Sequence, residues 1–480
     1  MQLLIDMIKI IAQSLAEVLG LGFNLLNKDH RLKAGYGSKR VLSKKHKGYG
    51  VGHLNLKMSD SDKSMLIVGP SGTGKSTCFY MNTMFSSDAN FAVLDGSGEL
   101  LKNNGGALVE RGYTIYVINA NNADESTDGW NPIKALKTSS ENSKSFATIL
   151  VNNAMKKTSD VFWNLSSIDT IAFFTDYMFE ALPEEEHTMF NLKNLLQDFA
   201  GNGEAFDKKF ADPNKVSDKT YRAYKSFVAS DVKITSGVLA NCLAALSVFD
   251  NPDVARVTST HTFSMEHFIN NEKQAVFIQN SVLSQEYLRP VNSLFFYFFW
   301  ETMMRDKRPE TSPLCMFLID EASSIYLGNM LPLALVNLRK HFGTICLGIQ
   351  SFQQLQSMYS HEQAVNILQN CHVKVFLRNL DINFSKMISD MLGAYTYRDD
   401  SSDSNRNRQL MPADVIRSMK ENECLLFVGG KRGVLIKNLK PFYKIKSYLK
   451  LSKIPMPVMA KSPLPMPEYV SDNADTNDEL

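Results

Sequence analysis

The stretch SMLIVGPSGTGKST, residues 64–77, decides the fold of this chain. Its four apolar residues, 65–68, lead directly into a glycine-rich turn that is followed by Lys75, Ser76 and Thr77. This order is typical of a buried strand that ends at a phosphate-binding loop and continues as a helix. It predicts an α/β protein built around a P-loop.

The spacing of the loop follows from the chemistry of phosphate binding. Gly69 and Gly72 allow the backbone to wrap closely around an anion, and Gly74 permits a tight entry into the helix. Lys75 is expected to reach the β- and γ-phosphates, and the Ser76 hydroxyl to hold Mg²⁺. We predict that ATP and Mg²⁺ bind here. The expected nucleotide-binding residues are Gly69, Pro70, Ser71, Gly72, Thr73, Gly74, Lys75, Ser76 and Thr77.

A second nucleotide-binding signal is LCMFLIDEA, residues 314–322. Six apolar residues end in Asp320 and Glu321, the form of a Walker B strand. The first acid is expected to hold the Mg²⁺ shell together with Ser76, and the second to polarise the attacking water. We therefore predict that Asp320 is a metal-site residue and that Glu321 is catalytic, as is Lys75.

Two further residues are candidates for sensing or completing the site. The predicted strand 343–349 ends in Gln350, whose side chain could sense the γ-phosphate from the carboxyl edge of a sheet; a helix cap or turn residue is the alternative. Arg339, between the strands 314–319 and 343–349, is a candidate finger that reaches a neighbouring subunit's nucleotide. A solvated surface arginine is the alternative for Arg339.

A tight acidic turn, DGSGEL, follows the predicted strand 91–95. Asp95 and Glu99 flank this turn at the edge of the sheet where ligands bind. They could act in catalysis or could simply cap the next helix, and the capping interpretation is the favoured one.

The remaining pattern predicts a parallel sheet that is interrupted by helices. The strand 113–119 follows the helix after the acidic turn, strand signals stop between about 145 and 268, and the sheet resumes at 274–280. The predicted order is an amphipathic N-terminal helix (1–27), the first part of the nucleotide-binding domain (28–144), an all-α domain (145–268), the second part of the nucleotide-binding domain (269–453), and a Pro-rich, acidic, disordered tail (454–480).

The composition limits the number of domains and the classes of function that the chain can have. The 480 residues are enough for two or three domains, and 44% hydrophobic with 21% charged residues is typical of a globular protein. The net charge of +2 excludes a uniformly basic nucleic-acid binder, so contacts with nucleic acid must use local patches. The six cysteines are scattered, which favours buried thiols in a reducing, cytosolic compartment.

Two basic segments and an apolar N-terminus suggest attachment surfaces. Polar residues recur in 1–19 at helical spacing, and three charges there argue against a transmembrane helix. The segment could dock on a membrane surface or partner, or pack on the protein's own core. A basic run follows at 28–47 and could be a solvated linker or meet phosphates of lipid or DNA. Residues 431–453 hold eight basic residues and no acid.

Together these motifs resemble the TraG-like family of type IV secretion system coupling proteins, the ATPases that feed DNA and proteins into conjugation machines. The resemblance covers about residues 35–445 in the family's order. It is carried by GYGSKR (35–40), GPSGTGKST (69–77), LDGSGEL (94–100), GWNPI (129–133), LIDEA (318–322), QSFQQLQSMYS (350–360) and ILQNCHVKVFLRN (367–379).

The resemblance implies a RecA-like P-loop NTPase motor domain that is interrupted by an inserted all-α domain and assembles as a homohexamer. It also implies single-stranded DNA, a relaxase with its relaxosome proteins, and type IV secretion channel components as partners. The sequence departs from the family in two places: the usual two N-terminal transmembrane helices are not expected here, and Ser97 stands where a lysine is common. We therefore expect a cytoplasmic protein that is peripheral at the inner face of the membrane, or one docked on a small membrane-protein partner.

Three classes of function fit the sequence. The leading one is a DNA-translocating ATPase. The second is a secretion ATPase that moves protein without DNA, and the third is an adaptor that uses nucleotide only to assemble. Glu321 counts against the third class because a module that only binds nucleotide does not need a second acid.

Overall fold

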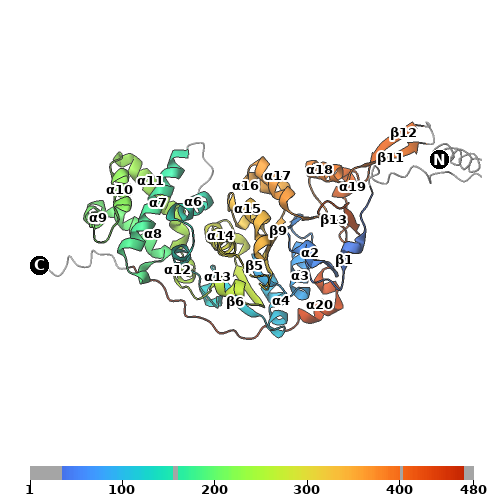
Figure 1. Cartoon of the computed structure of the whole chain (residues 1–480), viewed down its shortest axis with the longest axis horizontal. Helices are drawn as coiled ribbons and strands as arrows, with labels where there is room; N and C mark the ends of the chain where they lie inside the picture. Colours follow the sequence, from blue (N-terminus) through green and yellow to red (C-terminus); the bar gives the residue numbers. More distant parts are fainter. Residues whose placement is uncertain (1–34, 155–160, 400–403, 470–480) are drawn as a thin grey trace, which may run out of the picture.

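A nine-stranded sheet forms the centre of the molecule (Figure 1). The computed structural model describes residues 35–154, 161–399 and 404–469. The strand order is β14-β13-β10-β4-β9-β8-β5-β7-β6, and the strands from β10 to β6 run parallel. The strands are β4 (Met65–Val68), β5 (Asn90–Asp95), β6 (Thr114–Asn119), β7 (Gln274–Gln279), β8 (Cys315–Ile319), β9 (Gly343–Ile349), β10 (Val373–Phe376), β13 (Cys424–Val428) and β14 (Val434–Ile436). The predicted α/β sheet is confirmed.

The apolar run before the P-loop is buried on both faces of this sheet. Along β4, Leu66 and Val68 belong to one hydrophobic cluster, whereas Met65 and Ile67 belong to a second cluster on the opposite face. Successive side chains of a strand point to opposite faces, so a continuous apolar run is what a central parallel strand requires. The long apolar helix α14 (Arg289–Arg305) packs in the first cluster.

Between β6 and β7 the described chain is helical, as the sequence predicts. The helices are α5 (Pro132–Thr138), α6 (Ser143–Ala154), α7 (Val161–Ala181), α8 (Met189–Gly201), α9 (Gly203–Phe210), α10 (Asp218–Val228), α11 (Val232–Leu246), α12 (Pro252–Ser259) and α13 (Met265–Asn270). In Figure 1 the helices α6 to α12 form a body to one side of the sheet. The exact boundaries of this all-α domain stay a prediction.

Among the described residues one helix, Val232–Asp250, is long and apolar enough by composition to span a bilayer. It comprises α11 and the short η5 (Ser247–Asp250). Val238, Cys242 and Leu246 are buried in the helical body. Packing inside the protein therefore accounts for this apolar face.

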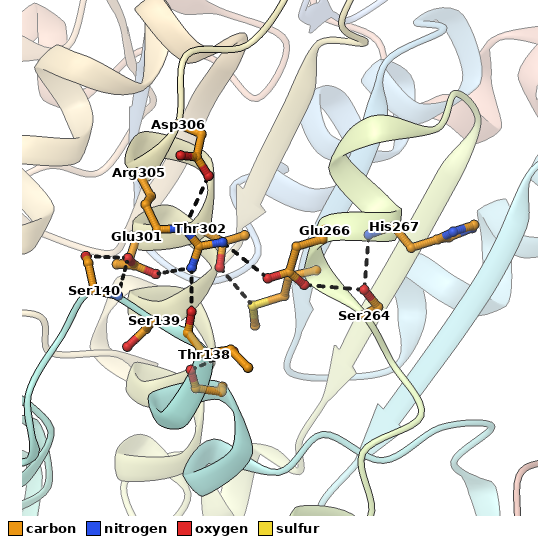
Figure 2. A network of polar contacts seen from close by, with 12 residues as sticks. Thr138, Ser139, Ser140, Ser264, Glu266, His267, Glu301, Thr302, Arg305 and Asp306 are labelled. Carbon is orange, nitrogen blue, oxygen red and sulfur yellow. Dashed lines mark hydrogen bonds and ion pairs between the residues drawn. The ribbon is translucent and has the colours of Figure 1, made fainter.

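A polar network joins the helical body to the sheet where the chain crosses between them (Figure 2). The buried Glu301 of α14 accepts hydrogen bonds from the backbone N and the hydroxyl of Ser140, at 3.1 and 2.7 Å. One turn later Arg305 donates to the Thr138 carbonyl at 3.0 Å and pairs with Glu266 of α13 at 3.5 Å. The C-terminal end of α14 thus contacts both the segment that enters the helical body, at Thr138 and Ser140, and the segment that leaves it, at Glu266.

The basic run 28–47 is not simply a linker. Its described part contains the short helix η1 (Lys39–Val41) and the strand β1 (Leu42–Ser43), which joins β2 (Gly50–Val51) and β3 (Leu54–Leu56) in a small sheet. Leu42 and Leu56 are buried in the second hydrophobic cluster, so burial of apolar side chains fixes this segment on the motor. The predicted N-terminal helix 1–27 lies outside the described residues.

The prediction of a disordered tail is wrong for residues 454–469. This segment has no helix or strand, but it follows the surface from α20 (Lys446–Leu451) toward the helical body (Figure 1). Leu464 is buried, its carbonyl accepts from Arg256 at 2.8 Å, and Ser462 N donates to the Thr127 carbonyl at 2.8 Å. Tyr469 donates a 2.6 Å hydrogen bond to Asp198. These contacts hold a segment that has no regular structure of its own; residues 470–480 lie outside the described part.

Candidate nucleotide site

The P-loop follows β4 and leads into a helical segment, as predicted. Gly72 and Gly74 adopt positive φ angles of 74° and 97°, which favour glycine because a Cβ would clash with the backbone. The helix starts as a π-helix over Ser76–Tyr80 and continues as α3 (Met81–Ser86). The loop therefore presents backbone N–H groups at a helix N-terminus, the arrangement that binds phosphate.

Lys75 is buried at the base of this loop. Its Nζ donates to the carbonyls of Gly69 at 2.6 Å and Pro70 at 3.4 Å. Burial lowers the pKa of Lys75, while the nearby charges of Glu321 and Asp320 raise it. The ammonium group is thus held inside the loop by carbonyl oxygens, and the charges of two acids lie near it.

The two predicted metal-site residues contact each other. Ser76 donates a 2.5 Å hydrogen bond to Asp320 Oδ2, although 244 positions separate them in sequence. Burial raises the pKa of Asp320 to about 6, despite the hydrogen bond from Ser76 and the charge of Lys75. Asp320 Oδ1 is fully buried without a hydrogen-bond partner among the described residues. Hydroxyl and carboxylate oxygens are preferred Mg²⁺ ligands, so this pair fits the predicted ion.

Glu321 is held by two glutamine side chains. Gln350 Nε2 donates to Glu321 Oε2 at 2.8 Å, and Gln354 Nε2 donates to Glu321 Oε1 at 3.0 Å. Gln354 also accepts from the backbone N of Gln350 at 3.0 Å, and Ser323 donates to Glu321 Oε1 at 3.0 Å. Gln350 is not the cap of α16 (Phe352–Met358), because Ser351 is its N-cap. Both Glu321 oxygens are therefore oriented before any ligand binds.

The acidic turn supports the capping interpretation of Asp95. Its two carboxylate oxygens accept from the backbone N of Leu100 at 3.2 Å and of Leu101 at 2.9 Å. These residues begin α4 (Glu99–Glu110), so Asp95 satisfies donors that a helix N-terminus leaves unpaired. Burial raises the pKa of Asp95, and these backbone hydrogen bonds oppose that rise.

Arg339 does not line the nucleotide cleft of its own chain. It lies in the short helix η8 (Leu338–His341), just before β9, and its Nε contacts Asp62 Oδ2 at 3.1 Å. Asp62 precedes β4, which is parallel to β9, so the pair lies at the amino edge of the sheet, opposite the P-loop. Its predicted role toward a neighbouring subunit stays a prediction.

Most of the predicted site residues line a cleft of about 460 Å³, and Arg339 does not. Lys75, Ser76, Asp320, Glu321 and Gln350 all line it. The cleft also contains Ser97 of the acidic turn, and two residues that the sequence did not single out, Gln285 and Tyr443. Tyr443 comes from η9 (Phe442–Lys444), far along the chain, and no local sequence signal predicts this approach. The local signal for Gln354 is that a second glutamine amide follows Gln350 after four residues.

A family model described as Type IV secretory system Conjugative DNA transfer matches residues 24–463 of this chain. The chain belongs to this family. The resemblance to TraG-like coupling proteins stated from the motifs is thus confirmed.

Two relatives are VirD4 proteins. The one from Rhizobium radiobacter is 20% identical over 437 residues, which cover 86% of this chain and 62% of that protein. The one from Agrobacterium fabrum is 24% identical over 255 residues, which cover 48% of this chain and 37% of that protein. The chain therefore spans less than two thirds of the length of either relative.

Solved structures of the plasmid coupling protein TrwB share the fold. The complex with the non-hydrolysable ATP analogue ADPNP has a TM-score of 0.65 at 16% identity, covering 85% of this chain and 93% of that one. The complex with ADP and Mg²⁺ has a TM-score of 0.64 at 16% identity, covering 85% of this chain and 94% of that one. The predicted fold, a RecA-like P-loop NTPase domain with an inserted all-α domain, is confirmed.

Proposed function

We propose that this protein is an ATP-hydrolysing coupling protein that recruits relaxase-bound single-stranded DNA and drives it into a type IV secretion channel. The observation that carries the proposal is the Glu321 carboxylate, which two glutamine amides hold at the cleft shared by Lys75 and the Ser76–Asp320 pair. A nucleotide-binding adaptor has no use for such an oriented second acid. TrwB complexes with ADPNP and with ADP and Mg²⁺ support ATP and Mg²⁺ as ligands here.

Each residue of the cleft has a distinct part in hydrolysis. The P-loop amides and Lys75 hold the β- and γ-phosphates and place the terminal phosphate at the carboxyl edge of the sheet. Ser76 and Asp320 would hold Mg²⁺, and the ion would supply positive charge beside the phosphate oxygens. Glu321 accepts a proton from the attacking water, and Gln350 and Gln354 keep its carboxylate oriented toward that water. Gln350 can report the loss of the γ-phosphate because it contacts Glu321.

The family membership supports DNA as the cargo, and a homohexamer as the assembly in which Arg339 would reach a neighbouring site. Relaxase, relaxosome proteins and secretion channel components are the partners proposed on the same basis. The apolar segment 1–19 and the basic run 28–47 support a peripheral location at the inner face of the membrane, either directly or through a small membrane-protein partner.

A protein-translocating ATPase is the second candidate function, because the same cleft would serve it equally well. ATP turnover measured with and without single-stranded DNA, beside the mass of the assembly, separates the two. DNA-stimulated turnover by a ring-sized assembly is the expected result. Turnover that DNA leaves unchanged, but that a secreted protein stimulates, would favour the second candidate.

A further inference from the structure

A hollow of about 500 Å³ lies beside the nucleotide cleft, at the end of the molecule formed by the small sheet and α20. Four lysines line it, Lys44, Lys440, Lys444 and Lys446, together with His53 and Tyr448. No acidic side chain lines it, and within the described ranges none of the four lysines makes an ion pair. We propose that this lysine pocket binds a phosphate group, at a site separate from the P-loop.

The positive charge in the lysine pocket comes from two segments that are far apart in sequence. Lys44 belongs to the basic run 28–47, whereas the other three lysines belong to the acid-free stretch 431–453. Like charges brought together in one concave site raise the local potential, and an anion relieves their repulsion. Burial and the charges of Lys440 and Lys44 lower the pKa of His53, so its ring is neutral near pH 7. Its Nδ1 has no partner among the described residues.

The walls of the lysine pocket are fixed to one helix. Asn82 of α3 donates to the carbonyls of Gly52, at 2.8 Å, and Lys440, at 3.3 Å. Gly52 has a φ of 60°, and a Cβ there would lie 2.8 Å from Lys440 N, so only glycine allows the two segments to meet so closely. Tyr448 stacks on Phe85 of the same helix with ring centroids 5.2 Å apart. The hollow is therefore formed before a ligand arrives.

The lysine pocket and the nucleotide cleft meet at η9 but do not share a residue. Tyr443 lines the nucleotide cleft, and the adjacent Lys444 lines the lysine pocket. Both pockets thus adjoin the helix that begins at the P-loop, which comprises η2 (Ser76–Tyr80) and α3. A phosphate group in the lysine pocket would be a second ligand and not a part of the bound ATP.

Two sources could supply the phosphate group: an anionic lipid headgroup, or a free phosphate compound. The basic run 28–47 continues from Lys44 to Lys47 at the same end of the molecule, which suits a membrane surface. Only the lipid source rests on the proposed peripheral location. The phosphate site itself does not depend on ATP hydrolysis or on DNA transfer.

The test measures pyrophosphate binding by calorimetry in a Lys75→Ala background, which weakens phosphate binding at the P-loop. The pocket pair, Lys44→Gln with Lys446→Gln, is compared with a control pair, Lys437→Gln with Lys450→Gln. Both pairs change exposed lysines and remove the same charge at the same end of the molecule. We expect the pocket pair to weaken binding about 10-fold or more, and the control pair less than about 3-fold, at low ionic strength. Circular dichroism checks that both pairs fold.

Sedimentation with vesicles of phosphatidylglycerol and phosphatidylcholine identifies the source. If the pocket pair binds both pyrophosphate and vesicles more weakly than the control pair does, the site is assigned to lipid headgroups. A difference for pyrophosphate but not for vesicles assigns it to free phosphate compounds. Equal pyrophosphate affinity for the two pairs would overturn the proposal, as would a pocket-dependent loss seen only for a single-stranded oligonucleotide.

Discussion

The side-chain amide of Gln354 donates to Glu321 across 33 positions of sequence, and Gln350 donates to the other oxygen of the same carboxylate. A carboxylate held on both oxygens loses little freedom when it engages a water molecule. The contact therefore links the segment that follows β8 to α16, the helix that follows β9, and it makes Gln354 a positioning residue.

Substitution of Gln354 should separate turnover from binding. Gln354→Ala removes one of the hydrogen bonds that orient Glu321, so kcat should fall about 5- to 20-fold while KM for ATP stays within about 2-fold. Gln353→Ala is the matched control, because Gln353 is exposed on the same helix. A rise in KM alone, or an equal effect of the control, would contradict the positioning role.

Substitutions of Lys75 and Glu321 should affect nucleotide binding and hydrolysis differently. Lys75→Ala removes the charge that faces the phosphates, and we expect nucleotide affinity to fall about 10-fold or more, with turnover lost. Glu321→Gln should still bind ATP but lose at least about 100-fold in hydrolysis, because the water is no longer activated. Binding of a fluorescent ATP analogue and phosphate release measure the two effects. Wild-type turnover by Glu321→Gln would refute the assignment of the general base.

The pKa of Asp320, raised to about 6, predicts a pH-dependent stability effect. The pKa of Asp320 in the folded protein lies above its value near 3.9 in the unfolded chain, so ionisation of Asp320 destabilises the fold. The destabilisation is complete above about pH 6 and absent below about pH 4. Asp320→Asn should therefore raise the free energy of unfolding of the metal-free protein by about 2 kcal/mol at pH 8. At pH 5 the expected gain is about half of that. Thermal unfolding in a chelator measures both values. A gain that is the same at the two pH values would show another cause.

Arg339 should act between subunits if the finger hypothesis holds. Specific ATPase activity should then rise with protein concentration, because each site needs a neighbour. A mixture of Arg339→Ala and Lys75→Ala proteins should recover part of the activity, since one competent site can form at a mixed interface. The control variant is Asp62→Asn, which removes the acid that contacts Arg339 at 3.1 Å and leaves the arginine in place. If the mixed assemblies recover no ATPase activity, Arg339 is a surface residue without a role in the neighbouring site.

The C-terminal segment should contribute to stability. Leu464 is 7% exposed, so Leu464→Ala removes buried apolar surface and should lower the free energy of unfolding by about 2 kcal/mol. Val458, which is fully exposed in the same segment, provides the control in Val458→Ala. Denaturant unfolding compares the two variants. Equal stabilities would mean that the segment contributes nothing to the fold.

Local sequence determined the main parallel strands, the P-loop and the Walker B acids. Each of these features is encoded within a dozen residues, by apolar runs that must be buried and by glycines that must lie where the backbone turns around phosphate. The helical insertion was also readable, because β-strand patterns are missing over more than a hundred residues. The sequence also left two roles open for Asp95, and the hydrogen bonds from the backbone N of Leu100 and Leu101 support capping of α4.

Only the tertiary structure decided which side chains meet. Gln354 reaches Glu321, Arg339 faces Asp62 at the opposite edge of the sheet, and Lys44 shares a pocket with Lys440. The path of residues 454–469 could not be predicted either, because Leu464 is buried in a hydrophobic cluster whose other members are distant in sequence. Periodicity and spacing describe one segment at a time, whereas these contacts depend on how separate strands and helices pack against a common sheet and a common helix, α3.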